Sequence, residues 1–269
     1  MSHKILGPLL VTVPHSGETI PPEASWLQSI DPLVLLTDVD RFVDQLYQPA
    51  CQELGCSLVS TSIHRYAVDL NRLPTDIDAT LVQGAPAASK QAPFVSGFHW
   101  AQTTQGHPLL RAPISMSVHQ RLTALYHDSF HQAVEDQERL LIDSRGLPRY
   151  HIDAHSMPSQ GTGAHKDAGQ KRPDIVVSDF HGQCSGSEFK DLVIKAYEQQ
   201  GFAVSYNWPY LGGRMTQRYG RPHEGRHTVQ VELNRALYMD EKTKLKNDLF
   251  DQTQMRIKAA LVEIAKAIS

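Results

Sequence analysis

The sequence predicts an α/β fold in which helices cover a mixed, largely parallel β-sheet. Short apolar runs with strand character alternate along the chain with longer segments whose apolar residues recur at helical spacing. The first run, at residues 8–13, is continuously apolar, as expected of a buried strand. The last run, at residues 229–233, alternates apolar and polar residues, which is the pattern of a strand with two different faces.

Further segments complete this alternation. Strands are expected at residues 57–62, 150–155, 174–178 and 202–206, and helices at residues 31–54, 118–139, 187–200 and 239–268. Residues 209–225 are expected to be loop. Residues 73–114 are rich in Pro, Ala, Gly and Ser and are expected to form a long loop or lid. Because no Pro-, Gly- and Ser-rich linker divides the chain, residues 1–269 are expected to form a single domain.

Composition and charge exclude several classes of protein. The chain is 41% hydrophobic with a net charge of −3, and it has no basic run, so no nucleic-acid partner is expected. No apolar stretch reaches the roughly 18 residues that span a bilayer, and the N-terminus lacks the cleavage site of a signal peptide. Cys51, Cys56 and Cys184 lack paired spacing and are expected to be reduced thiols of a cytoplasmic protein that does not bind a membrane.

Two histidines lie at the ends of predicted strands. His15 follows the first strand in VPHSGE, and His155 ends the strand YHIDAH. Ligands of open α/β sheets bind at the carboxyl ends of strands, and imidazole is a common zinc ligand. Asp153 points to the same side of its strand as His155 and would orient that ring. A surface turn histidine and a core histidine with a backbone partner are the alternatives.

A third metal ligand would be a carboxylate, because two histidines and one carboxylate form the ligand set of many zinc hydrolases. The acidic stretch TDVDRFVD offers Asp38, Asp40 and Asp44. Asp40 and Asp44 are four residues apart and are expected to share a helix face. Glu18 is a further candidate, since it follows His15 at HxxE spacing. A solvated acidic helix face is the alternative to a metal site.

Other residues have the chemistry of an acid–base group and of an anion clamp. Glu232 lies in the middle of the predicted strand at 229–233, where a carboxylate near an activated water could act as general base and then as general acid. A strand glutamate paired with an arginine is the alternative. In RYAVDLNRLP, Arg72 with the adjacent Asn71 could grip a carboxylate through a fork of N–H donors. Structural salt bridges with Asp69 are the alternative.

Five motifs together resemble those of the N-formylglutamate amidohydrolases, within the wider zinc carboxypeptidase and aspartoacylase-like group. They occur in the same order between about residues 9 and 241, as VPHSGETIPP, TDVDRFVDQLY, RYAVDLNRLP, DAHSM and GRPHEGRHTVQVELNRALYMDE. The resemblance implies a phosphorylase/hydrolase-like, three-layer α/β/α sandwich and one divalent metal ion, usually zinc. It also implies hydrolysis of N-formyl-L-glutamate to formate and L-glutamate, a step of histidine degradation.

The resemblance also implies roles for individual residues. Its two metal-ligating histidines correspond to His15 and His155, and its catalytic acid–base residue corresponds to Glu232. The third ligand that it favours is Asp40, with Glu18 and Asp38 as alternatives.

Substrate binding is implied for a separate set of residues, namely Asn71, Arg72, Arg65 and Arg218. The expected partner is a small acidic N-acyl amino acid. One departure from the family pattern follows Gly213, where the chain reads RMTQRYG instead of a Tyr followed by Thr-Arg. Arg214 and Arg218 either replace the missing contacts or select a different acid. The rival functions are a zinc carboxypeptidase, another N-acyl amino acid deacylase, and a non-catalytic metal- or amino-acid-binding protein.

Overall fold

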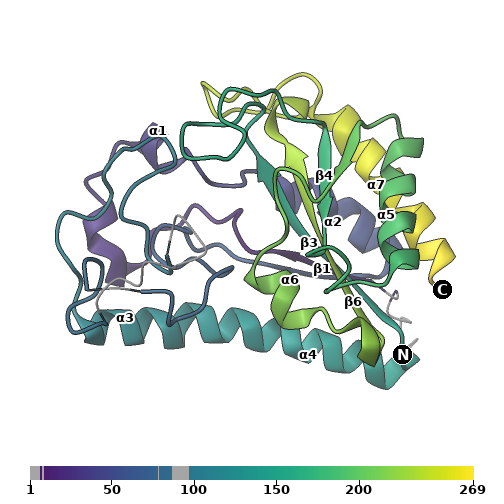
Figure 1. The fold of residues 1–269 in the computed structure, drawn as a ribbon, viewed down its shortest axis with the longest axis horizontal. Helices are drawn as coiled ribbons and strands as arrows, with labels where there is room; N and C mark the ends of the chain where they lie inside the picture. The colour runs from purple at the N-terminus through teal and green to yellow at the C-terminus, as the bar shows by residue number, and fades with distance from the viewer. Residues whose placement is uncertain (1–6, 8, 78, 87–96) are drawn as a thin grey trace.

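A mixed, largely parallel β-sheet forms the centre of the molecule (Figure 1). The computed structural model describes residues 7, 9–77, 79–86 and 97–269. Its strands are β1 (Leu9–Val13), β2 (Ser57–Ser60), β3 (Arg149–Met157), β4 (Ile175–Ser178), β5 (Val204–Tyr206) and β6 (Arg226–Asn234). Within the described ranges they pair in the order β2-β1-β3-β6-β4-β5. Strands β2, β1, β3 and β6 are mutually parallel, whereas β4 and β5 run antiparallel to them.

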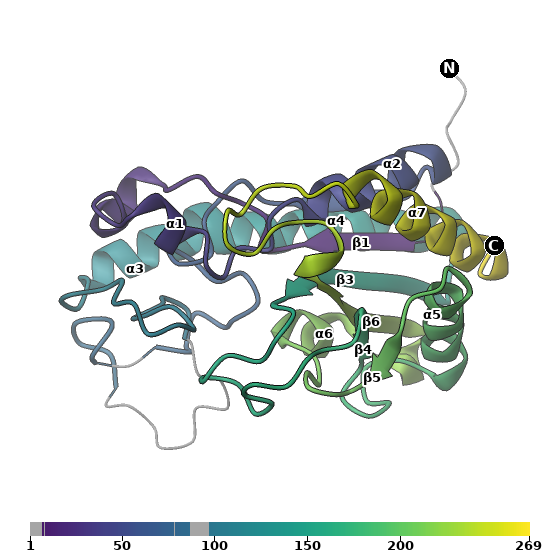
Figure 2. The same cartoon turned by 90° about the horizontal axis from the view of Figure 1, so that it is seen from above.

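Helices cover both faces of this sheet, as Figures 1 and 2 show. On one face lie α2 (Val43–Leu54), α5 (Ser187–Gln199) and α7 (Phe250–Ala267), and on the other lie α4 (Asp128–Arg145) and α6 (Arg214–Tyr219). A π-helical turn, Thr123–His127, joins α3 (Met116–Leu122) to α4 in one long rod. The shorter helices are Pro22–Leu27, α1 (Pro32–Leu35), Pro222–Glu224 and Arg235–Leu237. The three-layer α/β/α sandwich is therefore confirmed.

The two faces of the central strands differ in polarity. On β3, Ile152 and Ala154 point into an apolar core shared with α2, α5 and α7, whereas His151, Asp153 and His155 point to the opposite face. Buried polar groups are costly unless they are hydrogen-bonded, and here they bond one another across strands. Thr12 of β1 donates to Asp153 at 2.9 Å and bonds His151 at the same distance. The polar face of the sheet can therefore carry functional side chains, while the opposite face keeps its apolar core.

The predicted helix at residues 31–54 is wrong over its middle. The chain leaves the helix after α1, and Phe42 adopts a left-handed φ of 66° before α2 begins. In the break, the backbone N–H of Asp40 donates to the carbonyl of His15 at 2.9 Å. Asp40 is thus held beside the end of β1. The spacing had predicted that Asp40 and Asp44 share a helix face, and this prediction is wrong because Asp40 lies before α2 begins.

Two further boundaries differ from the prediction. The helix expected at residues 239–268 begins only at Phe250, because the Asp240 carboxylate accepts two backbone N–H bonds from the following residues and folds them into a turn. The loop expected at residues 209–225 contains α6, whose first turn is closed by a hydrogen bond from the Gly213 N–H to the Thr216 hydroxyl at 3.0 Å. Both differences come from local side-chain bonds to the backbone.

The region predicted to be a long loop has little regular structure. In its described parts, 73–77, 79–86 and 97–114, backbone pairing is limited to isolated bridges such as Val82 with Ile114. Residues 87–96 lie outside the described residues, so the lid remains a prediction, as does the single domain. Cys51, Cys56 and Cys184 are free thiols, as predicted. Among the described residues, no helix combines the length and apolarity that a bilayer crossing requires.

Buried neutral histidines make the fold sensitive to acid. Burial lowers the pKa of His64 and His99 to about 4 and that of His131 to about 3, against an ordinary value of 6.5. The unfolded chain therefore binds protons more readily than the folded chain below pH 6.5. Stability is fully present above pH 6.5 and is lost as the pH falls toward 4, by roughly 3 kcal/mol per histidine at most.

Urea unfolding measured between pH 7.5 and 4.5 in the presence of a chelator checks this expectation. The free energy of unfolding should stay level from pH 7.5 to about 6.5 and then fall as the pH approaches 4.5. A flat profile down to pH 4.5 would contradict it.

Candidate active site

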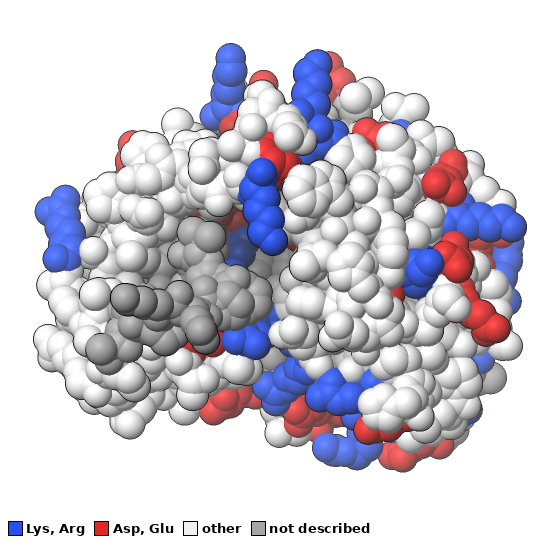
Figure 3. Space-filling view, viewed as in Figure 1, with Lys and Arg blue, Asp and Glu red and all other residues white. Residues whose placement is uncertain are grey.

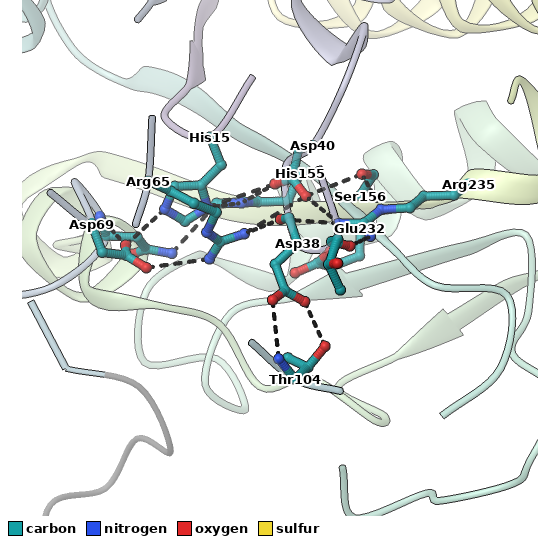
Figure 4. A network of polar contacts seen from close by, with 12 residues as sticks. His15, Asp38, Asp40, Arg65, Asp69, Thr104, His155, Ser156, Glu232 and Arg235 are labelled. Carbon is teal, nitrogen blue, oxygen red and sulfur yellow. Dashed lines mark hydrogen bonds and ion pairs between the residues drawn. The ribbon is translucent and has the colours of Figure 1, made fainter. Parts of the chain in front are cut away.

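Side chains from separate parts of the chain meet at the carboxyl ends of the central strands (Figure 4). His15 lies in the turn that follows β1, and His155 lies near the end of β3. Glu232 on β6 is the register partner of His155. Because β1, β3 and β6 are adjacent and parallel, their carboxyl ends lie at one edge of the sheet. The structure thus brings together the three residues that sequence reasoning placed on or after strands.

His15, Asp40 and His155 place three ligand atoms within reach of one ion. The Nδ1 atoms of the two histidines are 3.2 Å apart. Asp40 Oδ2 lies 3.6 Å from the Nδ1 of His15 and 3.1 Å from that of His155. Ligand atoms around a tetrahedral zinc ion, with bonds of about 2.0–2.1 Å, lie about 3.3 Å from one another. The triangle therefore has the dimensions of three corners of a tetrahedral zinc site.

Each histidine is oriented by a carboxylate on its other nitrogen. His15 Nε2 donates to Asp69 Oδ1 at 2.7 Å, and His155 Nε2 donates to Asp153 Oδ2 at 2.9 Å. An ionised carboxylate only accepts, so the ring proton belongs on Nε2 and the lone pair of Nδ1 faces the triangle. All four side chains are buried. This carboxylate–histidine pairing is the arrangement that surrounds metal ions in proteins, and the donor set fits a divalent cation.

Asp40 is kept ionised by its surroundings. Burial alone would raise the pKa of the Asp40 carboxyl, but its contacts with His15 and His155 and the charge of Arg65 hold that pKa well below its usual range. Its Oδ1 atom accepts from the Ser156 hydroxyl at 3.1 Å and from Arg235 at 3.0 Å. One carboxylate oxygen is thus bound to the protein, and the other remains directed at the two histidines.

Glu232 is a buried carboxyl, and the positive groups around it compensate only part of the cost of burying its negative charge. Its Oε1 accepts from Gln230 Nε2 at 2.8 Å. Burial raises the pKa of Glu232 to about 7, against the opposing effect of His155. A carboxyl with a pKa near neutrality can both take up and release a proton at physiological pH, as general acid–base catalysis requires.

The two alternative carboxylate ligands lie outside the triangle. Glu18 is at the surface, where it pairs with Arg41 at 2.6 Å. Asp38 is buried, and its oxygens accept from the Tyr66 hydroxyl at 2.6 Å and from the Thr104 N–H at 3.0 Å. The geometry therefore favours Asp40 as the third ligand.

The predicted anion clamp lies on the segment that also supplies Asp69. Asn71 Oδ1 accepts from the Met215 N–H at 2.8 Å, at the start of α6, and Asn71 Nδ2 lies 3.4 Å from His155 Nε2. Arg72 is partly buried beside it and donates to the Asn71 carbonyl at 2.8 Å. The Asn71 oxygen is therefore engaged in structure, and Arg72 adds a positive charge on the same segment.

The other two predicted substrate-binding arginines occupy different places. Arg65 lies beside the triangle, with NH1 3.8 Å from Asp40 Oδ1 and NH2 3.3 Å from Asp69 Oδ2. Arg218 pairs instead with Glu135 of α4 at 2.8 Å and is partly exposed. The structure does not bring Arg218 to the cluster of His15, Asp40 and His155.

Some residues of the cluster were missed by sequence reasoning. Arg235 donates to the carbonyls of Thr37 and Asp38 as well as to Asp40, so it fixes the break in the first helical region. Asp69 had been considered as a partner of Arg72, but it orients His15. The one signal in the sequence is that Asp69 and Arg235 lie within motifs that had already been selected, RYAVDLNRLP and VELNRALYMDE.

Replacing Asp69 with asparagine is expected to weaken zinc binding by about 10- to 100-fold, because His15 would lose the anionic partner that fixes its ring. Competition with a chromophoric chelator measures the affinity. The matched control is Asp179→Asn, which removes an equally buried carboxylate that bonds Tyr206 outside the cluster. Zinc affinity equal to that of the unmodified protein would show that Asp69 does not support the ligand.

Comparison with known proteins shows which family the chain belongs to. A family model described as N-formylglutamate amidohydrolase matches residues 7–239. N-formylglutamate deformylases from Pseudomonas aeruginosa and Pseudomonas putida are each 29% identical to the chain over 259 residues, covering 94% of this chain and 91% of theirs. The crystal structure of N-formylglutamate amidohydrolase from Ralstonia eutropha superposes with a TM-score of 0.87 at 26% identity, covering 99% of this chain and 95% of that one. Because the family model spans most of the chain, the protein belongs to the N-formylglutamate amidohydrolase family.

Proposed function

We propose that the protein hydrolyses N-formyl-L-glutamate to formate and L-glutamate with one bound zinc ion, as a step of histidine degradation. The triangle of His15, Asp40 and His155 beside Glu232 is the observation that carries the proposal. It supplies three ligand atoms and a neighbouring proton-transfer group in one buried place. The names of the relatives supply the substrate.

The residues present fit a divalent cation, and each has a separate role in the reaction: three bind the cation and one transfers protons. A zinc ion held by His15, Asp40 and His155 would lower the pKa of a bound water toward neutrality and polarise the formyl oxygen. Glu232 takes the proton of the attacking water and passes it to the departing amine nitrogen. Its raised pKa suits both transfers.

Arg65 is placed to stabilise negative charge on the formyl oxygen. Its guanidinium lies next to Asp40 and packs over the Trp100 ring at 4.8 Å. Among the described residues, Arg65 Nε is buried without a hydrogen-bond acceptor. A buried, preorganised donor of this kind stabilises an oxyanion more strongly than water does, because the site is shielded and the donor does not have to reorient.

Selectivity for the substrate comes from its carboxylates, because the formyl group itself is small. Arg72 binds one carboxylate from the segment next to Asn71 and so places the amide over the metal site. In the space-filling view, Lys and Arg atoms lie in a depression between the region around α1 and α3 and the region of the sheet (Figure 3). Positive charge there favours an acidic substrate.

A substrate panel tests the proposed reaction against its rivals. Formate or acid release is measured with N-formyl-, N-acetyl- and N-succinyl-L-glutamate and with a peptide ending in glutamate. The proposal expects the highest kcat/KM with the N-formyl compound. Faster turnover of a longer acyl group would indicate a different deacylase, and cleavage of the peptide a carboxypeptidase. Zinc binding without turnover of any substrate would indicate a binding protein.

A further inference from the structure

Arg172 lies at the same sheet edge as Glu232, outside the set of metal ligands. Its NH1 donates at 3.3 Å to the carbonyl of Pro158, the residue directly after β3. Its own carbonyl accepts from Asn234 Nδ2 at 3.3 Å, at the end of β6. These two contacts place the Arg172 segment beyond the carboxyl ends of the two strands that carry His155 and Glu232.

The guanidinium of Arg172 is held rigidly and retains donor capacity. Its Nε and NH2 donate to the two carboxylate oxygens of Asp167 at 2.7 and 2.8 Å, and its side chain is 1% exposed. With the bond to Pro158, three of the five N–H groups of the guanidinium are used within the described residues. One N–H group on each terminal nitrogen remains for a further acceptor.

Tyr210 completes a donor cluster with Arg172. Its ring lies over the Arg172 guanidinium at 5.1 Å, and its carbonyl accepts from the Ser178 hydroxyl at the end of β4 at 2.8 Å. In the part of the chain that the structure describes, no group is hydrogen-bonded to the Tyr210 hydroxyl. Burial raises the pKa of Tyr210, and the nearby charge of Glu232 adds to the rise, so the hydroxyl remains a proton donor at neutral pH.

We propose that the remaining N–H groups of Arg172 and the hydroxyl of Tyr210 bind the side-chain carboxylate of the substrate. The inference rests on the proposed hydrolysis of N-formyl-L-glutamate. A guanidinium and a phenol on one side of a carboxylate provide charge-assisted hydrogen bonds with a fixed direction.

The distance along β3 selects this carboxylate over the α-carboxylate. Pro158 follows His155 by three residues, so the contact of Arg172 lies about 10 Å along the strand direction from the metal ligand. The side-chain carboxylate is the more distant of the two from the formyl carbon. Arg72 approaches from a separate segment, beside the Asn71 amide that lies 3.4 Å from His155 Nε2, and is left to bind the α-carboxylate.

The test compares N-formyl-L-glutamate with its side-chain amide, N-formyl-L-glutamine, and with its α-amide. The variants are Arg172→Gln and Tyr210→Phe, and zinc content is measured for each. In the unmodified protein the side-chain amide should lose about 10- to 100-fold in kcat/KM. In both variants the ratio of kcat/KM for N-formyl-L-glutamate to that for the side-chain amide should become smaller, because the KM for N-formyl-L-glutamate rises. The loss of kcat/KM with the α-amide, relative to N-formyl-L-glutamate bound at the same α-carboxylate site, should not depend on Arg172 or Tyr210.

The matched control is Tyr206→Phe, because the Tyr206 hydroxyl bonds Asp179 at 2.7 Å on the far strands of the sheet. Its penalties should equal those of the unmodified protein. Tyr210→Phe retains the ring over Arg172, so it stays informative if Arg172→Gln fails to fold. An unchanged side-chain penalty in Tyr210→Phe and in any folded Arg172→Gln would reduce Arg172 to a structural partner of Asp167 and overturn the inference, while the proposed function stands. No formate release by the unmodified protein would overturn both.

Discussion

Replacing Glu232 with glutamine is expected to lower kcat for N-formyl-L-glutamate by about 10²- to 10⁴-fold. The amide has the same shape, and its oxygen can still accept from Gln230 Nε2, so the fold and the zinc content should not change. It cannot, however, take a proton from water or pass one to the amine. Formate release and metal analysis on the same preparation measure the two effects.

The pH profile gives a second view of Glu232. The general base must be deprotonated, so kcat/KM should fall on the acid side as Glu232 takes up a proton. Burial moves the pKa from 4.5 toward about 7, and a bound cation opposes that rise, so the midpoint should lie between these values. Glu224→Gln, which changes an exposed carboxylate, is the control and should leave kcat unchanged. A Glu232→Gln variant within tenfold of the unmodified enzyme would remove Glu232 from the mechanism.

Removing a histidine ligand is expected to have the second large effect. His15→Ala should lower kcat/KM by at least about 10³-fold, since a Lewis acid contributes several kcal/mol to the reaction and each 1.4 kcal/mol is tenfold. The fold should persist, because Asp69 keeps its bonds to Asn71, Trp100 and Arg65. Zinc content by elemental analysis should fall well below one ion per chain.

Added imidazole makes the test of His15 sharper. Imidazole can occupy the space of the lost side chain, so it should restore part of the zinc binding and of the activity. The control is His223→Ala, which changes an exposed histidine and should alter neither quantity. Full zinc content and near-normal turnover in His15→Ala would show that the triangle is not the metal site.

Much of the sheet and part of the site could be predicted because they depend on local patterns. Alternating apolar residues located the strand that carries Glu232, and the strand ends located His15 and His155. A largely parallel sheet followed from the α/β alternation, but the adjacency of β1, β3 and β6 was not predicted. The choice of Asp40 came from the family resemblance, because spacing alone did not separate it from Asp38.

The remainder depends on contacts between distant residues, which periodicity does not encode. The left-handed backbone at Phe42 is uncommon for a residue with a side chain, so the helical pattern extended across it. Asp69 meets His15 across 54 positions of sequence, and Arg235 meets Asp40 across 195. Pairs of this kind are set by the sheet order and not by the sequence around either residue.

The central claim is that His15, Asp40 and His155 hold a metal ion that is needed to hydrolyse N-formyl-L-glutamate. The most direct measurement is formate release by chelator-stripped protein before and after addition of one equivalent of zinc. The account predicts almost no formate before the addition and turnover afterwards, with no such recovery in His15→Ala. Equal formate release by the stripped and zinc-loaded protein would contradict the account.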